Sequence, residues 1–459
     1  MTAKSKLNLF DFTMIVVSLV IGMGIFRTPL NVAKASPDTF LFFGAWIAGG
    51  LVALCGALTY AEIGSRLPVT GGYYKIFSYA YHPSIAFAIN CVILVSNAAS
   101  LAGVALVGGE YITGIFIPLS KDPEWIKIAA NAGYVQTIQI VIAISAIVIF
   151  YGINLMGLKM SAKTQSVLTV IKITLILLLI TPIFFASPSA SNALPVHSIS
   201  PTFMEYLKAF GIGLVAVSFT YGGYQQTINF GEEVNKPAKN IPRGIFFGIF
   251  IIIALYLTIN YAYVKVIGYE TLHNPDTKNI AAIMASKIFG INAERILSGF
   301  LFLSVLAYVN VLLMSNPRVM FAMSEDKILP DVFKKRNSKT DVLTVSLSVF
   351  AALCALIVFW AKEFDTILSF TIFLDSFGMA LSAGTIFILR KKTAHLNDTG
   401  IYIMKWYPLL PVIFITAYLF VAASLLINET KLSLIGLAVL IGFIGIYFAV
   451  KGLVKKIEE

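Results

Sequence analysis

Charged side chains are scarce in this 459-residue chain, where Asp, Glu, Lys and Arg together make up 12% of the residues. Hydrophobic residues reach 58%, which is far above the share found in water-soluble domains. The chain has only four His, all expected in loops, and its three Cys fall inside apolar stretches at no metal-ligand spacing. The sequence therefore argues against a redox role for the thiols, a metal site and a histidine proton relay.

Long uncharged runs are abundant instead. A run of about 18 or more mostly uncharged residues is long enough to cross a bilayer as a helix, and twelve such runs occupy nearly the whole sequence. We therefore expect an all-α integral membrane protein with a single membrane transport domain over residues 1–459. The predicted spans are 10–35, 39–65, 84–116, 134–156, 161–187, 203–232, 242–268, 293–323, 341–361, 366–390, 407–427 and 431–454.

The formal net charge of +11 has a topological explanation. Most Lys and Arg residues fall in the loops on the same side as the N-terminus. Such an excess marks cytoplasmic loops, and an even number of spans places both ends of the chain on one side. We predict a multi-pass protein of the cell membrane with both termini in the cytoplasm, and we expect no nucleic-acid partner.

Two of the predicted spans are interrupted by glycines near their middle. The first span contains IGMGIF (Ile21–Phe26), and the sixth contains FTYGGY (Phe219–Tyr224). Glycine allows a helix to unwind at mid-membrane depth, which frees backbone N–H and C=O groups. Hydrocarbon cannot satisfy these groups, so such breaks persist only beside a protein or water cavity. Paired breaks in two halves of a chain indicate the binding site of an inverted-repeat transporter.

Four segments, in order along the chain, carry a resemblance to a known family. They are VIGMGIFRTP (Val20–Pro29), ALTYAEIGSRLPVTGGYY (Ala57–Tyr74), FTYGGYQQTINFGEEVNKPAKNIPRGI (Phe219–Ile245) and NPRVMFAMSEDKILP (Asn316–Pro330). Together they resemble the amino acid–polyamine–organocation superfamily of transporters, in particular its L-type amino acid transporter branch and the bacterial relatives of that branch. Each motif alone is moderately specific, and the ordered set is strong.

The resemblance implies the LeuT fold, with discontinuous helices one and six. Spans one to five (about 10–187) and six to ten (about 203–390) would then form a 5+5 inverted repeat. The last two spans (about 407–454) would be peripheral helices.

An amino acid at the bilayer centre needs N–H donors for its carboxylate and carbonyl oxygens for its ammonium group. The N–H groups around Met23 lie at the positive end of a half-helix dipole, and the break after Phe219 offers carbonyls. The alternative is that these glycines only allow close helix packing. The residues expected to bind substrate are Ile21, Gly22, Met23, Gly24, Ile25, Phe219, Thr220, Tyr221, Gly222, Tyr224, Gln225 and Asn310.

Individual positions carry more specific expectations from the resemblance. Met23 stands where the family usually has Ser, so we expect altered selectivity or affinity but not loss of transport. Phe219 resembles the aromatic gate that covers bound substrate, although it could be an ordinary core or lipid-facing ring. Tyr224 and Gln225 occupy positions where the L-type branch has Trp and Asn. Asn310 aligns with a family Asn, and its alternative role is a hydrogen bond between helices.

Two ionisable residues lie inside predicted spans. Lys172 is about 13 Å of helical rise beyond Lys163, too deep for its stem to reach water easily. By resemblance it replaces the sodium ion of sodium-coupled relatives, tethering spans one, five and eight with Ser304 nearby, and it could carry a proton. Snorkelling without a coupling role is the alternative. Asp375 is a gating residue, a proton site, a selector of cationic substrates or, as we favour, an acid exposed in the outer vestibule.

Acidic and basic residues at the cytoplasmic helix ends form another group. Glu62, Glu232 and Glu233 could pair with Arg66, Arg243 and Arg318 as ion pairs that break during transport. Solvated helix ends are the simpler interpretation of each.

These observations lead to a functional prediction. We expect a sodium-independent secondary transporter of amino acids, with neutral L-amino acids as substrates, alternating access as the mechanism and exchange favoured. The alternatives are a proton-coupled symporter, a cationic amino acid or polyamine antiporter and, from a different class, a channel. We expect no enzymatic activity, cofactor or metal, and membrane lipid as the surroundings. The sequence leaves the need for an ancillary subunit open.

Overall fold

The computed structural model describes residues 6–116, 132–186, 202–274, 280–359, 364–397 and 400–458. Within these ranges the regular secondary structure is helical. Strand-like pairing is limited there to two isolated β-bridges, Leu7 with Val234 and Thr70 with Phe230. The expectation of an all-α protein is confirmed at this level.

The first half of the chain begins with a span that is divided into two helices. Its elements are α1 (Leu9–Val20), α2 (Gly24–Ala35), α3 (Thr39–Arg66), α4 (Gly72–Ala80), α5 (Pro83–Phe116), α7 (Ala132–Leu155), α8 (Leu158–Ile180) and the short 3-10 helix η1 (Thr181–Phe184).

The second half also begins with an interrupted helix. Its elements are α9 (Phe203–Tyr221), η3 (Tyr224–Asn229), η4 (Gly231–Glu233), α10 (Pro237–Ile267), α11 (Tyr269–His273), α12 (Ile280–Phe289), η5 (Gly290–Asn292), α13 (Ala293–Glu325), η6 (Asp331–Lys334), α14 (Thr344–Val358), α15 (Phe364–Lys392), η7 (Ala394–Leu396), α16 (Leu409–Asn428) and α17 (Thr430–Glu458).

Ten helical segments in the described part of the chain are long and apolar enough to cross a membrane. Two predicted spans fall short by this measure, because α14 has 15 residues and the apolar stretch of α17 covers Ser433–Ala449. The predicted spans 161–187 and 341–361 also end at residues outside the described ranges. Multi-pass membrane insertion is therefore supported, and the count of twelve spans stays a prediction.

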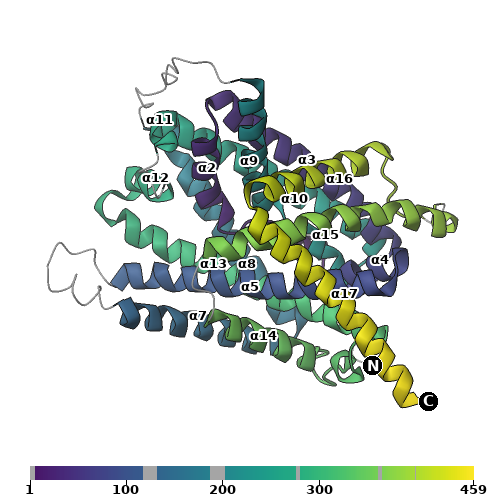
Figure 1. Ribbon diagram of the computed structural model, residues 1–459. Coiled ribbons are helices and arrows are strands. Elements are labelled where there is room, and N and C mark those ends of the chain that lie inside the picture. Colours follow the sequence, from purple (N-terminus) through teal and green to yellow (C-terminus); the bar gives the residue numbers. More distant parts are fainter. Residues whose placement is uncertain are drawn as a thin grey trace.

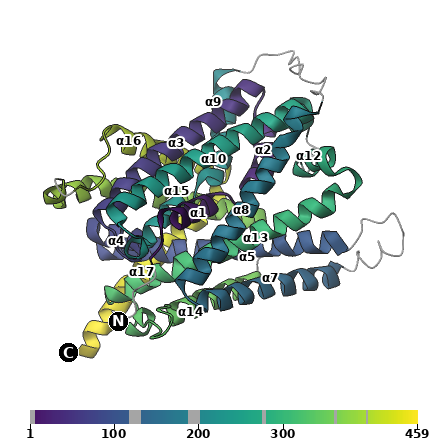
Figure 2. The same ribbon diagram turned by 180° about the vertical axis from the view of Figure 1, so that it is seen from behind.

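Helix α1 lies at the centre of the molecule, and the other helices surround it. All its residues from Phe12 to Val20 are buried, and it packs against α8, α10 and α13. Figure 2 shows α1 in the middle of the bundle, and Figure 1 shows α17 crossing α5 and α15, which it contacts. The two ends of the chain lie at the same end of the molecule in both views. Helix α1 therefore places the interruption that follows it deep inside the helix bundle.

Candidate functional site

The first span is interrupted at residues 21–23. Helix α1 ends at Val20, Ile21 is extended with ψ of 91°, and α2 begins at Gly24. The first N–H groups of a helix have no intrahelical carbonyl. Within the described chain, the N–H groups of Gly22, Met23 and Gly24 find no other backbone acceptor. The predicted break is confirmed, and it leaves donors at the positive end of α2.

The second interruption lies between α9 and η3. Gly222 caps α9 through a hydrogen bond from its N–H to the Phe219 carbonyl (3.2 Å), and Gly223 has φ of 109°. A side chain at Gly223 would be strained by this φ and would also collide with the Leu19 carbonyl oxygen. The glycine is therefore required both for the turn and for the close approach of α1.

The two interruptions meet at the same place. A Cβ atom on Gly24 would lie 2.9 Å from the Thr220 hydroxyl oxygen, and that hydroxyl donates to Thr28 Oγ1 in α2 at 2.8 Å. The Tyr256 hydroxyl lies within hydrogen-bonding distance of the Val20 carbonyl (3.2 Å) and the Thr220 carbonyl (3.3 Å). One phenol thus joins the carbonyl ends of both broken helices.

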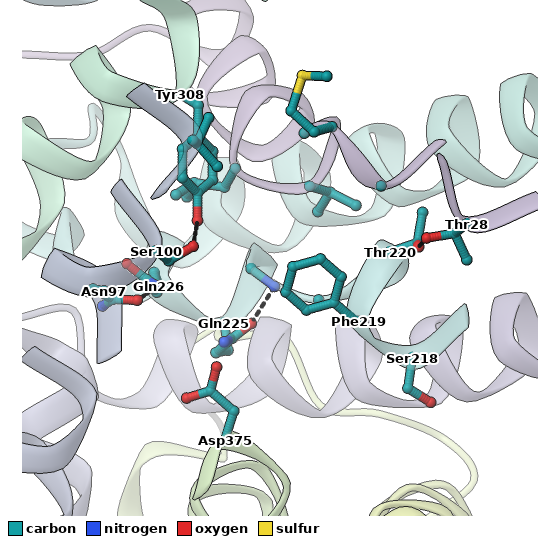
Figure 3. A pocket seen from close by; sticks show the side chains of 18 of the residues that line it. Thr28, Asn97, Ser100, Ser218, Phe219, Thr220, Gln225, Gln226, Tyr308 and Asp375 are labelled. Atoms are coloured by element: carbon teal, nitrogen blue, oxygen red, sulfur yellow. Dashed lines mark hydrogen bonds between the residues drawn. The ribbon is translucent and has the colours of Figure 1, made fainter. Parts of the chain in front are cut away.

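A cavity of about 140 Å³ lies beside the two breaks. Figure 3 shows Phe219, Gln225 and Asp375 at this cavity together with Asn97, Ser100 and Tyr308. Its wall consists of Leu19, Val20, Gly22, Met23, Gly24, Arg27, Thr28, Asn31, Asn97, Ser100, Val104, Ser218, Phe219, Thr220, Gly222, Gly223, Gln225, Gln226, Tyr308, Leu312, Asp375, Ser376, Met379 and Tyr418.

The cavity includes part of the predicted site. The residues that we predicted and that line it are Gly22, Met23, Gly24, Phe219, Thr220, Gly222, Gln225 and Asp375. The residues that we predicted and that do not line it are Ile21, Ile25, Tyr221, Tyr224, Asn310, Lys172 and Ser304. The structure thus brings eight of the predicted residues to one cavity and places the other seven outside it.

The two tyrosines of the second break lie in the core. The Tyr221 ring packs against the rings of Trp46 and Tyr256. Tyr224 packs edge-on against Tyr60, and its hydroxyl approaches Gly56 of α3 so closely that a Cβ there would collide. Both rings are fully buried against other helices, and neither lines the cavity.

Asn310 joins helices instead of lining the cavity. Its amide nitrogen donates to Gln165 Oε1 at 2.6 Å and to the Ser161 carbonyl at 3.2 Å, and its oxygen accepts from Asn154 at 2.9 Å. These bonds connect α13 to α7 and α8. Tyr308, two residues earlier on α13, and Leu312, two residues later, line the cavity instead. The interhelical alternative therefore describes Asn310 in this structure.

Lys172 contacts the first break but does not line the cavity. Its side chain is fully buried, and its ammonium donates to the Ile21 carbonyl at 2.6 Å and to Ser18 Oγ at 3.4 Å. The Ile21 carbonyl lies just beyond the end of α1, and the Lys172 ammonium thereby provides it with a hydrogen-bond donor. The Ser304 hydroxyl donates to Phe300 of its own helix at 3.0 Å. The observed tether thus joins α8 to α1, and Ser304 takes no part in it.

Asp375 lies in the cavity wall on α15. It shares one face of that helix with Met379, one turn later, and it points towards Gln225 in Figure 3. Its side chain is partly buried, whereas we expected an acid exposed in a vestibule. Among the residues that the structure describes, its carboxylate has no hydrogen-bond or ion-pair partner.

Several polar wall residues were missed by sequence reasoning. Asn97 and Ser100 are spaced three apart in the apolar run of α5, which places them on one face. This spacing of polar residues in an apolar helix was the signal by which the sequence could have identified them. Asn97 Oδ1 accepts from Gln226 Nε2 at 3.1 Å, and Ser100 Oγ lies 2.8 Å from the Tyr308 hydroxyl.

The end of the bundle that contains the N-terminus is held by backbone pairing and ion pairs. The Leu7 N–H donates to the Glu233 carbonyl at 2.6 Å, and the Glu233 carboxylate accepts from Arg318 Nε at 2.8 Å. The Arg318 guanidinium also lies 4.4 Å from the centre of the Phe230 ring. The segment before α1, the end of η4 and α13 are thus tied together.

A second ion cluster at this end is centred on Glu62. Its fully buried carboxylate accepts from Arg66 Nε and Arg390 Nη2, both at 2.7 Å, and from the Met404 N–H at 2.9 Å. The cluster links α3, α15 and the segment before α16. Of the ion pairs that we expected, Glu62–Arg66 and Glu233–Arg318 therefore form, and Arg243 is exposed.

Away from the end of the bundle that contains the N-terminus, the cavity reaches exposed residues. Arg27 in α2 lines it, with a side chain that is 45% exposed, and lies 3.8 Å from Glu110 of α5, which is 55% exposed. Asn31, one turn after Arg27, also lines the cavity and is exposed. The cavity is therefore accessible from the end where α2 finishes.

A sequence model of the family described as "Amino acid permease" matches residues 7–445, nearly the whole chain. The chain belongs to the amino acid permease family. This permease is similar to the serine/threonine exchanger SteT of Bacillus subtilis (strain 168), with 27% identity over 98% of this chain and 97% of the relative.

Two mammalian proteins are also similar to this permease. One is the large neutral amino acids transporter small subunit 2 of Mus musculus, with 25% identity over 97% of this chain and 81% of the relative. The other is the cystine/glutamate transporter of Homo sapiens, with 25% identity over 85% of this chain and 74% of the relative. The family and these relatives are transporters, so the chain is a transporter and not an enzyme. Its resemblance to the L-type branch of the amino acid–polyamine–organocation superfamily is confirmed.

Proposed function

We propose that this permease is a sodium-independent secondary transporter of neutral L-amino acids that works by alternating access and exchange. The observation that carries the proposal is the cavity between two broken helices, where backbone donors that find no backbone acceptor among the described residues meet a polar wall. The names of the relatives support an amino acid as cargo, because they specify serine and threonine, large neutral amino acids, or cystine and glutamate. The word exchanger in one of these names supports exchange.

The substrate carboxylate binds at the start of α2. The N–H groups of Gly22, Met23 and Gly24 provide donors, and the α2 dipole adds positive potential. The missing side chains at the two glycines let a ligand approach the backbone closely. Met23 supplies no hydroxyl, so the backbone alone holds the carboxylate.

The substrate ammonium binds at the end of α9. The Phe219 carbonyl accepts from Gly222, and the Thr220 carbonyl accepts from Tyr256. A carbonyl oxygen has two lone pairs, so each keeps capacity for a second donor. The half-buried Phe219 ring lies in the cavity wall, where it can cover a ligand from one side.

The proposed architecture is the LeuT fold, with twelve spans, an inverted repeat over about 10–187 and 203–390, and two peripheral helices. The packing supports it, because the first four spans of one half lie against the first four spans of the other. Helix α2 packs on α9, α3 on α10, α5 on α13 and α7 on α14. A pseudo-two-fold relation between the halves produces such pairs and brings the two breaks together at its centre.

Lys172 takes the place of a bound sodium ion in this proposal. Its ammonium donates to a carbonyl that the break in α1 has freed. An intramembrane cation that satisfies a backbone oxygen performs the structural task of a metal ion at that position. This supports sodium independence.

Alternating access requires a route from the cavity to each side. A second cavity of about 1020 Å³ lies at the N-terminal end, beside Glu233, Met314 and Arg318. Helix α13 contributes Leu312 to the first cavity and Leu313 to the second, so the two cavities are separate and both border this helix. With the N-terminal end in the cytoplasm, as the distribution of Lys and Arg indicates, the structure corresponds to a state that is closed on the cytoplasmic side.

Reconstitution into liposomes tests the proposal. We expect saturable uptake of labelled neutral amino acids that is the same in sodium and choline buffers and is stimulated by unlabelled amino acid inside. Efflux at full rate without external substrate would contradict exchange, and dependence on an imposed proton gradient would favour a symporter. Absence of uptake for every amino acid, with intact folding, would contradict amino acid transport. Unitary currents in planar bilayers would indicate a channel.

A further inference from the structure

The cavity wall contains hydrogen-bond acceptors that lack donors. The Asp375 carboxylate has no partner among the described residues, as noted above. Gln226 Oε1 is buried without a partner, while its Nε2 donates to Asn97. Both residues line the cavity, and they come from different elements, α15 and η3.

Among the described residues, no neighbouring side chain donates a hydrogen bond to the Asp375 carboxylate or to Gln226 Oε1. The Ser100 and Tyr308 hydroxyls bond to each other at 2.8 Å, and Gln225 Oε1 accepts from the Gly223 N–H at 2.9 Å. Gln226 Oε1 is buried without a donor, which is costly. A ligand that displaced water from the partly buried Asp375 carboxylate without supplying a donor would add a larger cost, because the carboxylate is charged. This part of the wall is therefore complementary to a ligand that brings donors of its own.

We propose that Asp375 and Gln226 form the subsite for the substrate side chain and select amino acids whose side chain carries a hydrogen-bond donor. Hydroxyl, amide and ammonium side chains satisfy these acceptors, whereas aliphatic side chains bury them without a partner. This inference rests on the proposed function, since it names the substrate class of the same cavity. The subsite would bind serine, threonine and glutamine more tightly than valine and leucine.

The elements that carry these acceptors favour contact with the side chain over contact with the substrate backbone. Residues Gly22 to Gly24 and the end of α9 face each other across the two breaks and together offer partners for the carboxylate and the ammonium. Asp375 belongs to a different helix and lies beside Gln225 in Figure 3. The remaining part of an amino acid is its side chain.

Threonine and valine provide the sharpest test, because they have nearly the same shape and differ by a hydroxyl in place of a methyl group. We expect isothermal titration of the full chain in detergent to give a threonine dissociation constant at least about tenfold below that of valine. In Asp375→Asn we expect the ratio of the valine to the threonine dissociation constant to fall towards one. Asp331→Asn is the matched control, because that exposed carboxyl lies in η6 outside the cavity, and it leaves the ratio unchanged.

Each result has a definite meaning. Valine binding as tightly as threonine to the unmodified protein overturns the subsite, even if the Asp375 variant does not fold. A ratio that Asp375→Asn leaves unchanged also overturns it. An equal loss of both ligands in that variant assigns Asp375 to the substrate ammonium and overturns the side-chain role, while amino acid binding stands. Lysine binding more tightly than threonine supports the subsite with ammonium as its best donor, and it overturns the neutral substrate class of the proposed function. If no amino acid binds, the proposed function fails first.

Discussion

Replacing Lys172 by methionine tests the tether between α8 and the first break. Methionine keeps most of the volume of the lysine stem, and it removes the ammonium that donates to the Ile21 carbonyl at 2.6 Å. A hydrogen bond from a charged donor contributes about 1.5–3 kcal/mol. The hydrogen bond favours the observed geometry of the first break over alternative geometries. At about 1.4 kcal/mol per factor of ten, its loss shifts that equilibrium by roughly ten- to hundredfold. We expect the initial rate of uptake to fall by at least tenfold.

The same substitution has a smaller effect on folding. Within the described chain no carboxylate pairs with Lys172, so methionine also relieves the cost of burying a lone cation. The lost hydrogen bond lowers the stability of the folded state, and the relieved cost of burying the cation raises it. We therefore expect the melting temperature of Lys172→Met to stay within a few degrees of the unmodified protein while transport is lost.

Uptake into proteoliposomes and thermal unfolding of the same preparations measure both effects. Lys163→Met is the matched control, since Lys163 lies on the same helix with an exposed side chain and the substitution removes the same charge. Full transport activity in Lys172→Met would refute the tether. Loss of folding together with activity would show that Lys172 is structural.

Three further substitutions test the site and its supports. Gly24→Ala places a methyl group against Thr220 and should reduce uptake severalfold, whereas Gly114→Ala meets open space and should not; equal uptake would contradict the close approach of the two breaks. Glu62→Gln leaves two guanidinium groups without their carboxylate and should lower the free energy of unfolding by about 3–5 kcal/mol in denaturant titrations, and a loss below about 1 kcal/mol would be inconsistent with the buried cluster. Phe219→Ala should raise the substrate dissociation constant about tenfold by removing a ring from the wall, and unchanged affinity would remove the covering role.

The helix breaks could be predicted because they depend on local chemistry. Glycine pairs inside long apolar runs are visible in the sequence, and no other residue tolerates the φ of Gly223 beside the Leu19 carbonyl. The depth of Lys172 was equally visible, because helical rise alone places it far from water. Short helices such as α4 and α12 were not predicted, since they lie in loops that lack a long apolar run.

The side chains that line the cavity were harder to predict because the rotation of each helix is set by packing. Asn310 and Tyr308 are two residues apart on α13 and therefore face different directions. Only the positions of α7 and α8 decide that Asn310 bonds to Gln165 and that Tyr308 meets the cavity. Tyr224 was expected in the site, but the absence of a side chain at Gly56 lets it enter the core instead.

The most direct measurement is the melting temperature of the purified permease in the presence of each of the twenty amino acids. A ligand that binds only the folded state stabilises it by about 2.7 kcal/mol at a concentration one hundred times its dissociation constant. We predict that a defined group of L-amino acids raises the melting temperature and that Gly24→Ala weakens this effect. Failure of every amino acid to stabilise the folded protein would contradict a substrate site between the two broken helices.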